Sequence, residues 1–267
     1  MENALFLIVL AFIMEVIDSG LGMGYGTILS PLLIIFGFSS NLVVPSILIS
    51  QAVGGFMAAF FHNKYKTADL FPSLVVGGED GKKHLSISKD LRISLLVGFL
   101  GVGATVVGAV LGVKLPKEIL KLYIGVLVTI IGVVLLLKRR FNFSWKKITG
   151  LAIISAFNKG ISGGGFGPLM TGGQVLSGNH AKKSIGSTTL SEVPICITGF
   201  IIYLLSKKVI SYDLLINLTI GAFFGGIVGP TLTKYLNVKL LQTLIAVLIL
   251  SEGIWLLSQS LFHFSLG

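Results

Sequence analysis

The sequence has little of the chemistry on which soluble enzymes depend. Its single cysteine, Cys196, lies within an apolar stretch, which excludes disulfides and a thiolate metal site. The four histidines are scattered through loops and the ends of apolar stretches, without the spacing of metal ligands. The phosphate-binding loop motif of P-loop NTPases does not occur, so the chain does not hydrolyse ATP by itself. We therefore expect no enzymatic activity, no metal and no cofactor.

Charge is also scarce. Charged residues make up 12% of the chain against 53% that are hydrophobic, and the mean hydropathy is +0.92. Several stretches of about 20 residues contain little or no charge, which is long enough for a helix to cross about 30 Å of hydrocarbon. The chain is therefore predicted to be an all-α integral protein that crosses the cytoplasmic membrane several times.

Acidic residues are about half as frequent as basic ones, 11 against 21, and the net charge is +10. In a soluble protein this excess would suggest a nucleic acid as the partner. In a membrane protein the basic residues flank the spans and set their orientation. We therefore expect the lipid bilayer as a partner and no nucleic acid.

Glycine, in contrast, is abundant and clusters twice. The stretches GLGMGYGTILSP at 20–31 and ISGGGFGPLMTGG at 161–173 interrupt apolar sequence and align at an offset of 141 residues. The same offset places SILISQ on STTLSE. This recurrence predicts a duplication, with a first transmembrane repeat at 1–140 and a second at 141–267. The first repeat includes a polar cytoplasmic loop at 63–92.

Each glycine-broken segment has two arrangements that fit its length. The apolar stretches on either side of the breaks are about 10 to 15 residues long, too short to cross alone at 1.5 Å per residue. The segment is then one broken crossing, or a hairpin of two half-helices that enters and leaves on the same face. With hairpins the basic residues of the loops divide 15 to 5 between the two sides, and with crossings they divide 13 to 7. The positive-inside rule favours hairpins, which leave three transmembrane helices in each of two inverted repeats, with both termini outside.

A glycine cluster between half-helices has a clear physical use. Backbone amides at the start of the second half-helix lack partners inside the helix, and the helix dipole adds partial positive charge there. Such an end holds an anion without a full cationic side chain, and glycine lets the anion approach closely. The candidate ends lie near Gly26–Thr27 and Gly167–Pro168. The alternative is that the glycines only allow close helix packing.

Ionisable residues inside the apolar stretches are few, and each needs a partner, water or a role. At the offset of 141, Asp18 aligns with Lys159, and residues near a pseudo-twofold axis approach each other. We therefore consider an Asp18–Lys159 ion pair. Alternatively, both residues lie at wet hairpin tips and never meet, or Lys159 attracts the substrate anion with Asn158 as a polar companion.

Glu192 occupies the place of Gln51 in the second half. A protonated carboxyl group there would donate a hydrogen bond to an anion and carry a coupled proton, because burial favours the neutral form. A structural hydrogen bond to a neighbouring helix is the alternative. Glu252 in the last span aligns with Ile131 and is left without a role.

These arguments define two sets of candidate residues. Serines on the same spans also pack well between helices, so part of the first set is structural. The residues expected to bind the substrate are Gly24, Tyr25, Gly26, Thr27, Ser50, Gln51, Asn158, Lys159, Gly165, Phe166, Gly167, Ser187 and Ser191. The residues expected to serve in coupling or in an ion pair are Glu15, Asp18 and Glu192.

The motifs as a set resemble the TauE/SafE family of sulfite exporters, also called the TSUP anion permeases. The resemblance covers the whole chain and rests on its length, on the polar loop after the second span and on three motifs, GLGMGYG, GISGGGFGPLM and AKKSIGSTTLSEVP. It implies transport of sulfite, sulfonates or related organosulfur anions by a permease without ATPase machinery. Met23 departs from the glycine-richer first motif of the family.

We therefore expect a secondary transporter that moves a small sulfur-containing anion by alternating access. Transport of the anion is expected to be coupled to H⁺ or Na⁺. The sequence is also compatible with a homodimer. One alternative is an exporter of another small organic anion or an amino acid, and another is a non-transporting membrane assembly protein. A membrane-embedded enzyme would need a nucleophile–base pair or a metal cluster, and the spans offer no such constellation of histidine or cysteine.

Overall fold

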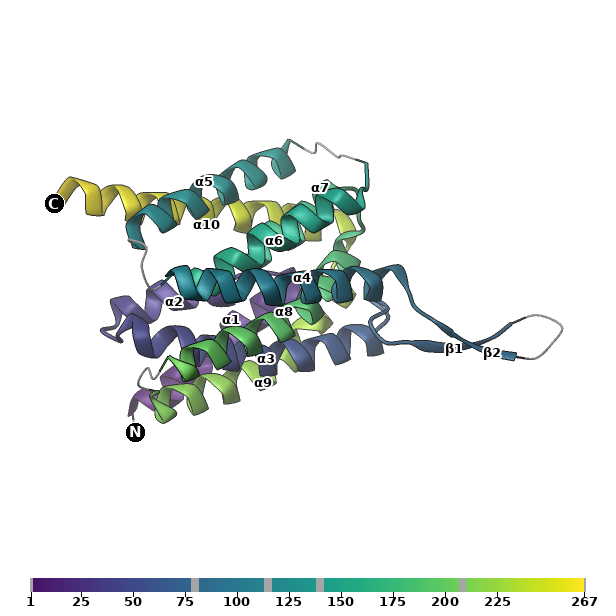
Figure 1. Cartoon of the computed structure of the whole chain (residues 1–267), viewed down its shortest axis with the longest axis horizontal. Coiled ribbons are helices and arrows are strands. Elements are labelled where there is room, and N and C mark those ends of the chain that lie inside the picture. The colour runs from purple at the N-terminus through teal and green to yellow at the C-terminus, as the bar shows by residue number, and fades with distance from the viewer. Residues whose placement is uncertain (1, 78–81, 113–116, 138–141, 207–209, 267) are drawn as a thin grey trace.

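The computed structural model describes residues 2–77, 82–112, 117–137, 142–206 and 210–266. These residues form α-helices and one antiparallel ribbon (Figure 1). The elements up to residue 140 are α1 (Glu2–Leu21), α2 (Tyr25–Ile35), α3 (Ser40–Lys64), β1 (Ser73–Gly77), β2 (Lys82–Ser86), α4 (Lys89–Gly112) and α5 (Lys117–Leu136). The later elements are α6 (Trp145–Ser162), α7 (Phe166–Leu176), α8 (Ala181–Leu205), α9 (Tyr212–Tyr235) and α10 (Val238–Leu266).

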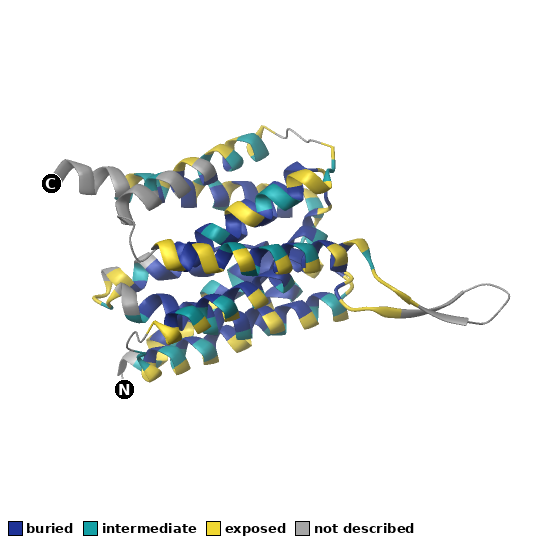
Figure 2. Ribbon diagram, in the orientation of Figure 1, coloured by how far each residue is buried: buried dark blue, intermediate teal, exposed yellow. Residues whose placement is uncertain are grey.

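The predicted all-α membrane class is confirmed. Among the described helices, α1, α3, α4, α8, α9 and α10 are long and apolar enough to cross a membrane. Large apolar side chains point away from the protein on these helices, for example Phe99, which is 83% exposed, and Leu5, which is 70% exposed. Figure 2 shows such exposed residues along the outside of the bundle and buried residues between the helices. Apolar surface of this extent is suited to lipid rather than to water.

The polar segment at 63–92 is more ordered than the loop that the sequence suggested. It contains the ribbon, in which Ser73 pairs with Ser86 and Gly77 with Lys82. The ribbon extends from one end of the helix bundle, on the right in Figure 1.

The helices that precede the glycine clusters are longer than predicted. α1 has 20 residues and α6 has 18, because Asp18 and Lys159 continue these helices instead of ending them. A helix satisfies its own backbone groups, so a polar side chain is tolerated in it wherever a partner lies inside the protein. The second arms, α2 and α7, have 11 residues each and match the predicted half-length.

In both glycine-broken segments the second arm runs back along the first. Gly173 near the end of α7 packs on Leu151 near the start of α6. Leu33 near the end of α2 shares a buried cluster with Leu7 near the start of α1. The chain therefore doubles back as the hairpin prediction requires, but the first arm is a full-length helix and not the predicted half-helix.

Two equivalent helix pairs each join one helix of the first half to one of the second. α1 runs parallel to α9, with Gly221 against Ile8 and Gly229 against Gly20, and α6 runs parallel to α4 through similar glycine contacts. α1 begins and α10 ends at the same end of the bundle, opposite the ribbon (Figure 1). These pairings agree with a duplicated plan, although the inverted duplication and its division at residue 140 remain predictions.

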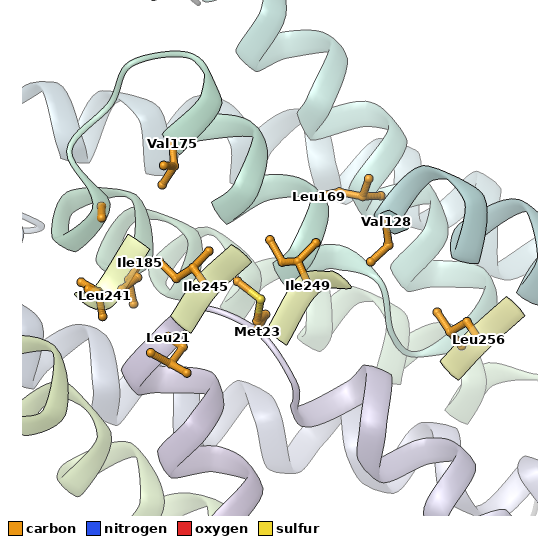
Figure 3. Packing of buried hydrophobic residues seen from close by; sticks show 11 residues of the cluster. Leu21, Met23, Val128, Leu169, Val175, Ile185, Leu241, Ile245, Ile249 and Leu256 are labelled. Atoms are coloured by element: carbon orange, nitrogen blue, oxygen red, sulfur yellow. The ribbon is translucent and has the colours of Figure 1, made fainter. Parts of the chain in front are cut away.

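One buried apolar cluster surrounds the first glycine break (Figure 3). Leu21 and Met23 come from the break itself, and α5 and α7 contribute further side chains. Met23 is fully buried there, so it fills apolar space where the second glycine cluster has Gly164. α10 faces the break with a buried stripe of Leu241, Ile245, Ile249 and Leu256, which are spaced by four, four and seven residues.

Candidate functional site

The two glycine clusters, far apart in the sequence, pack directly against each other. A Cβ atom at Gly26 would collide with the carbonyl oxygen of Gly163, and one at Gly167 would lie 2.6 Å from the carbonyl oxygen of Gly22. Only residues without a side chain permit two backbones to approach so closely. The packing role, which was the alternative for these glycines, is therefore present.

Hydrogen bonds and backbone geometry hold this crossing together. The amide of Gly165 donates to Thr27 Oγ1 at 3.2 Å, and Thr171 Oγ1 donates to the carbonyl of Gly22 at 2.8 Å. The role of these helix ends in anion binding stays a prediction. The left-handed region favours glycine, and it is occupied at Gly22 (φ 83°), Gly24 (φ 124°), Gly163 (φ 74°) and Gly165 (φ 77°).

The half-helices begin one residue before the predicted starts, α2 at Tyr25 and α7 at Phe166. The amide of Tyr25 donates to Asp18 Oδ1 at 3.0 Å. A carboxylate is stabilised at this end because the helix dipole is positive there. The start of α2 therefore already holds one anionic group, and both Tyr25 and Phe166 are buried beside it in apolar clusters.

Four polar side chains from four helices form a connected chain next to the crossing. Gln51 Nε2 on α3 donates to Asp18 Oδ2 on α1 at 3.3 Å. Lys159 on α6 donates to Gln51 Oε1 and lies 2.8 Å from Glu192 Oε1 on α8. All four side chains are buried, at 5% exposure or less. The ammonium group of Lys159 thus contacts the carboxylate of Glu192 directly and is linked to that of Asp18 through Gln51.

The Asp18–Lys159 ion pair that we considered is replaced by an indirect link. Gln51 lies between the two residues and bonds to both, while the partner of Lys159 in an ion pair is Glu192. The reason is that α8 brings Glu192 to the ammonium group from the other side. The wet-tip alternative is also wrong for this structure, since both residues are buried.

The predicted hydroxyl groups have different partners. Ser50 Oγ accepts from Tyr25 Oη at 2.8 Å, which joins α3 to the first break. Ser191 donates to a backbone carbonyl of its own helix. Ser187 donates to Gln174 Oε1 of α7 at 2.9 Å, so it braces the second hairpin. The sequence analysis did not select Gln174. An amide side chain in a short apolar half-helix nevertheless indicates a hydrogen bond to a neighbouring helix.

Three further buried side chains have no hydrogen-bond partner for any of their polar atoms among the described residues: Glu15, Asn158 and Glu252. Glu15 on α1 packs closely against Gly54 and Gly225, whose missing side chains make room for it. Glu252 Oε1 lies beside the first break. A buried carboxylate without a partner is costly, so groups of this kind are neutral or hold a ligand.

Comparison with known proteins agrees with this architecture. The model of the sulfite exporter TauE/SafE family matches residues 80–256, which is more than half of the chain. A relative from Bacillus subtilis (strain 168), described as probable membrane transporter protein YtnM, is 26% identical over 262 residues. That alignment covers 91% of this chain and 78% of the relative. No solved structure matches the chain significantly. The chain, a multi-pass membrane transporter, belongs to the sulfite exporter TauE/SafE family.

Proposed function

We propose that the protein is a secondary transporter of sulfite or a related organosulfur or sulfonate anion across the cytoplasmic membrane. The observation that carries this proposal is the position of Lys159 at the crossing of the two glycine breaks. Its Nζ lies 3.0 Å from the place that a Cβ of Gly26 would take. The ammonium group and the starts of α2 and α7 therefore add their positive potential at one buried place.

An oxyanion that reaches this place competes with Glu192 for the ammonium group. In the structure the carboxylate of Glu192 lies 2.8 Å from Lys159, and an entering anion takes over that contact. The glycines permit its approach to the amides of the first helical turns. The other residues proposed to surround the anion are Gly24, Tyr25, Gly26, Thr27, Ser50, Gln51, Asn158, Gly165, Phe166, Gly167, Ser187 and Ser191.

Alternating access needs the site to open to one side at a time. The two hairpins enter from opposite ends of the bundle, so movement of one against the other would expose the crossing to either end in turn. An H⁺ or a Na⁺ is proposed as the coupling ion, with Glu15, Asp18 and Glu192 as the groups that respond to it. Buried acids inside a membrane protein are the usual carriers of such coupling.

The proposed orientation places the ribbon end in the cytoplasm and both termini outside. Its support is the positive-inside rule, because the loops at the ribbon end carry most of the basic residues. Ser86 on the ribbon and Ser39 at the opposite end are both exposed and serve as matched positions for cysteine substitution. We expect an impermeant maleimide to label Ser39→Cys in intact cells and Ser86→Cys in inverted vesicles. The reverse pattern contradicts the orientation.

Transport is tested by exchange of labelled anions in proteoliposomes. We expect sulfite, thiosulfate or methanesulfonate to exchange faster than acetate or glycine. A double variant, Lys159→Met with Glu192→Gln, removes the buried charges together and should lower exchange at least tenfold in a folded protein. Lys183→Met, which removes a half-exposed lysine at the cytoplasmic end of α8, should leave exchange unchanged.

The alternatives predict other outcomes of the same assay. Faster exchange of acetate or of glycine would indicate a transporter of another organic anion or an amino acid. Absence of exchange for every anion, from a protein that is folded, would reject transport and favour a membrane assembly protein.

A further inference from the structure

Glu252 occupies an apolar position of α10. The buried stripe of this helix runs through Leu241, Ile245, Ile249 and Leu256, and residue 252 lies on the same face, three residues after Ile249 and four before Leu256. An acidic residue on a stripe that faces the protein interior is costly unless it has a function there.

The stripe directs Glu252 toward the first glycine break (Figure 3 shows the preceding stripe residue Ile249 close to Met23). A Cβ atom at Gly24, the residue that caps α2, would lie 3.6 Å from Glu252 Oε1. The side chain is 2% exposed, and neither carboxyl oxygen has a hydrogen-bond partner among the described residues. Its carboxyl group therefore lies beside the positive end of α2 without being used in the structure.

The charges around Glu252 do not compensate it. Across the break, α1 presents Asp18, which is itself acidic. On α8, Glu192 is the ion-pair partner of Lys159, so the ammonium group of this buried lysine is already used. α7 has no ionisable residue, and those of α5 lie at positions 117–123, well before Thr129, which packs on Gly253, the residue after Glu252. Ionised, Glu252 would add a further buried negative charge to a region that already has two carboxylates for one ammonium group.

From this geometry we propose that Glu252 binds the proton that travels with the anion. The inference rests on the proposed function and names a proton site for it. A bound anion at the start of α2 repels an ionised carboxylate at the same place, so the anion and the proton bind together. The step adds H⁺ to a carboxylate oxygen and forms a carboxylic acid; when the site opens to water the O–H bond breaks and the proton leaves with the anion. The described residues contain no cluster of three His, Cys, Asp or Glu that would hold a metal ion instead.

The protonation is tested by infrared spectroscopy of the purified protein at neutral pH. A protonated carboxyl group in apolar surroundings has a C=O stretching band distinct from that of a carboxylate. We expect Glu252→Gln to lose one such band and Ser251→Ala, an exposed neighbour on the same helix, to keep it. An unchanged band in Glu252→Gln means that Glu252 is ionised and overturns the proposal.

The coupling is tested with methanesulfonate in proteoliposomes, because this probe stays an anion across the pH range. With the membrane potential clamped at zero and a gradient of one pH unit, symport of one proton per anion gives about tenfold accumulation on the alkaline side. We expect wild type and Ser251→Ala to reach it. Glu252→Gln should keep exchange at equal pH but lose accumulation, with a final ratio of about one.

The outcomes separate this proposal from the function on which it rests. Exchange without accumulation in wild type, or full accumulation in Glu252→Gln, overturns the coupling role alone. No exchange of methanesulfonate by wild type rejects the proposed function for sulfonates and the coupling role with it. The infrared band still decides in that case whether Glu252 holds a proton.

Discussion

Removing the ammonium group of Lys159 should destabilise the protein more than any loss of a lysine at its surface. In Lys159→Met the carboxylate of Glu192 loses an ion pair of 2.8 Å, and Gln51 Oε1 loses its donor. Both partners stay buried, at 5% and 3% exposure, so water does not replace the lost contact. Breaking a buried pair from one side costs about 3–5 kcal/mol, because an uncompensated charge remains. This is a large share of a total stability of about 5–15 kcal/mol.

The free energy of unfolding is measured by SDS titration in mixed micelles, for the two single variants and their combination. Adding Glu192→Gln to Lys159→Met removes the unpaired charge and should recover at least half of the loss, since replacing both charged partners is often close to neutral. Lys183→Met is the matched control. Its ammonium group is half-exposed and lies 3.2 Å from Asp90, which is buried but keeps the backbone amide of Asp69 as a donor, so we expect a smaller loss of about 1 kcal/mol. A loss in Lys159→Met no larger than the control, or no recovery in the combination, refutes the reasoning.

Two further predictions concern the first glycine break, and both use the same SDS titration. Gly22→Ala should lose at least about 1–3 kcal/mol, because its φ of 83° is strained for alanine and the new Cβ would lie 2.5 Å from Thr171 Oγ1. Gly150→Ala, whose Cβ meets nothing within 4 Å in the middle of α6, should instead be neutral or gain up to about 1 kcal/mol; equal effects in the two variants would contradict the packing argument. Tyr25→Phe and Ser50→Ala should each lose about 1 kcal/mol, and their combination no more than either alone, because they share one hydrogen bond of 2.8 Å. Additive losses would show that this bond does not join α2 to α3.

The exposed apolar surface explains why the sequence alone predicted a membrane protein. A side chain such as Phe99 on α4 faces lipid whatever its neighbours are, so hydropathy and length alone identify a span. The positions of Gly22 and Gly163 were readable for a similar reason, since a break in an apolar stretch requires residues that adopt positive φ. The hairpin course of the chain also followed from a local quantity, the count of basic residues in each loop.

The lengths of the helices inside the core were harder to predict from the sequence. Asp18 and Lys159 look like the ends of apolar stretches, and the sequence therefore suggested first arms of about 10 to 15 residues. They continue α1 and α6 because partners from other helices reach them, Gln51 for both and Glu192 for Lys159. A pairing of this kind depends on four helices meeting, which no local pattern describes.

The sequence by itself determined an all-α membrane protein with two glycine breaks, because lipid demands long apolar helices and a break inside them demands residues that adopt positive φ. Only the tertiary structure decided how the buried polar groups meet. It assigned Glu192 rather than Asp18 to Lys159, and it directed Glu252 to the first break. The physical reason is that a buried charge is stabilised by whatever lies within a few ångströms of it, and those distances are set by helix packing rather than by separation along the chain.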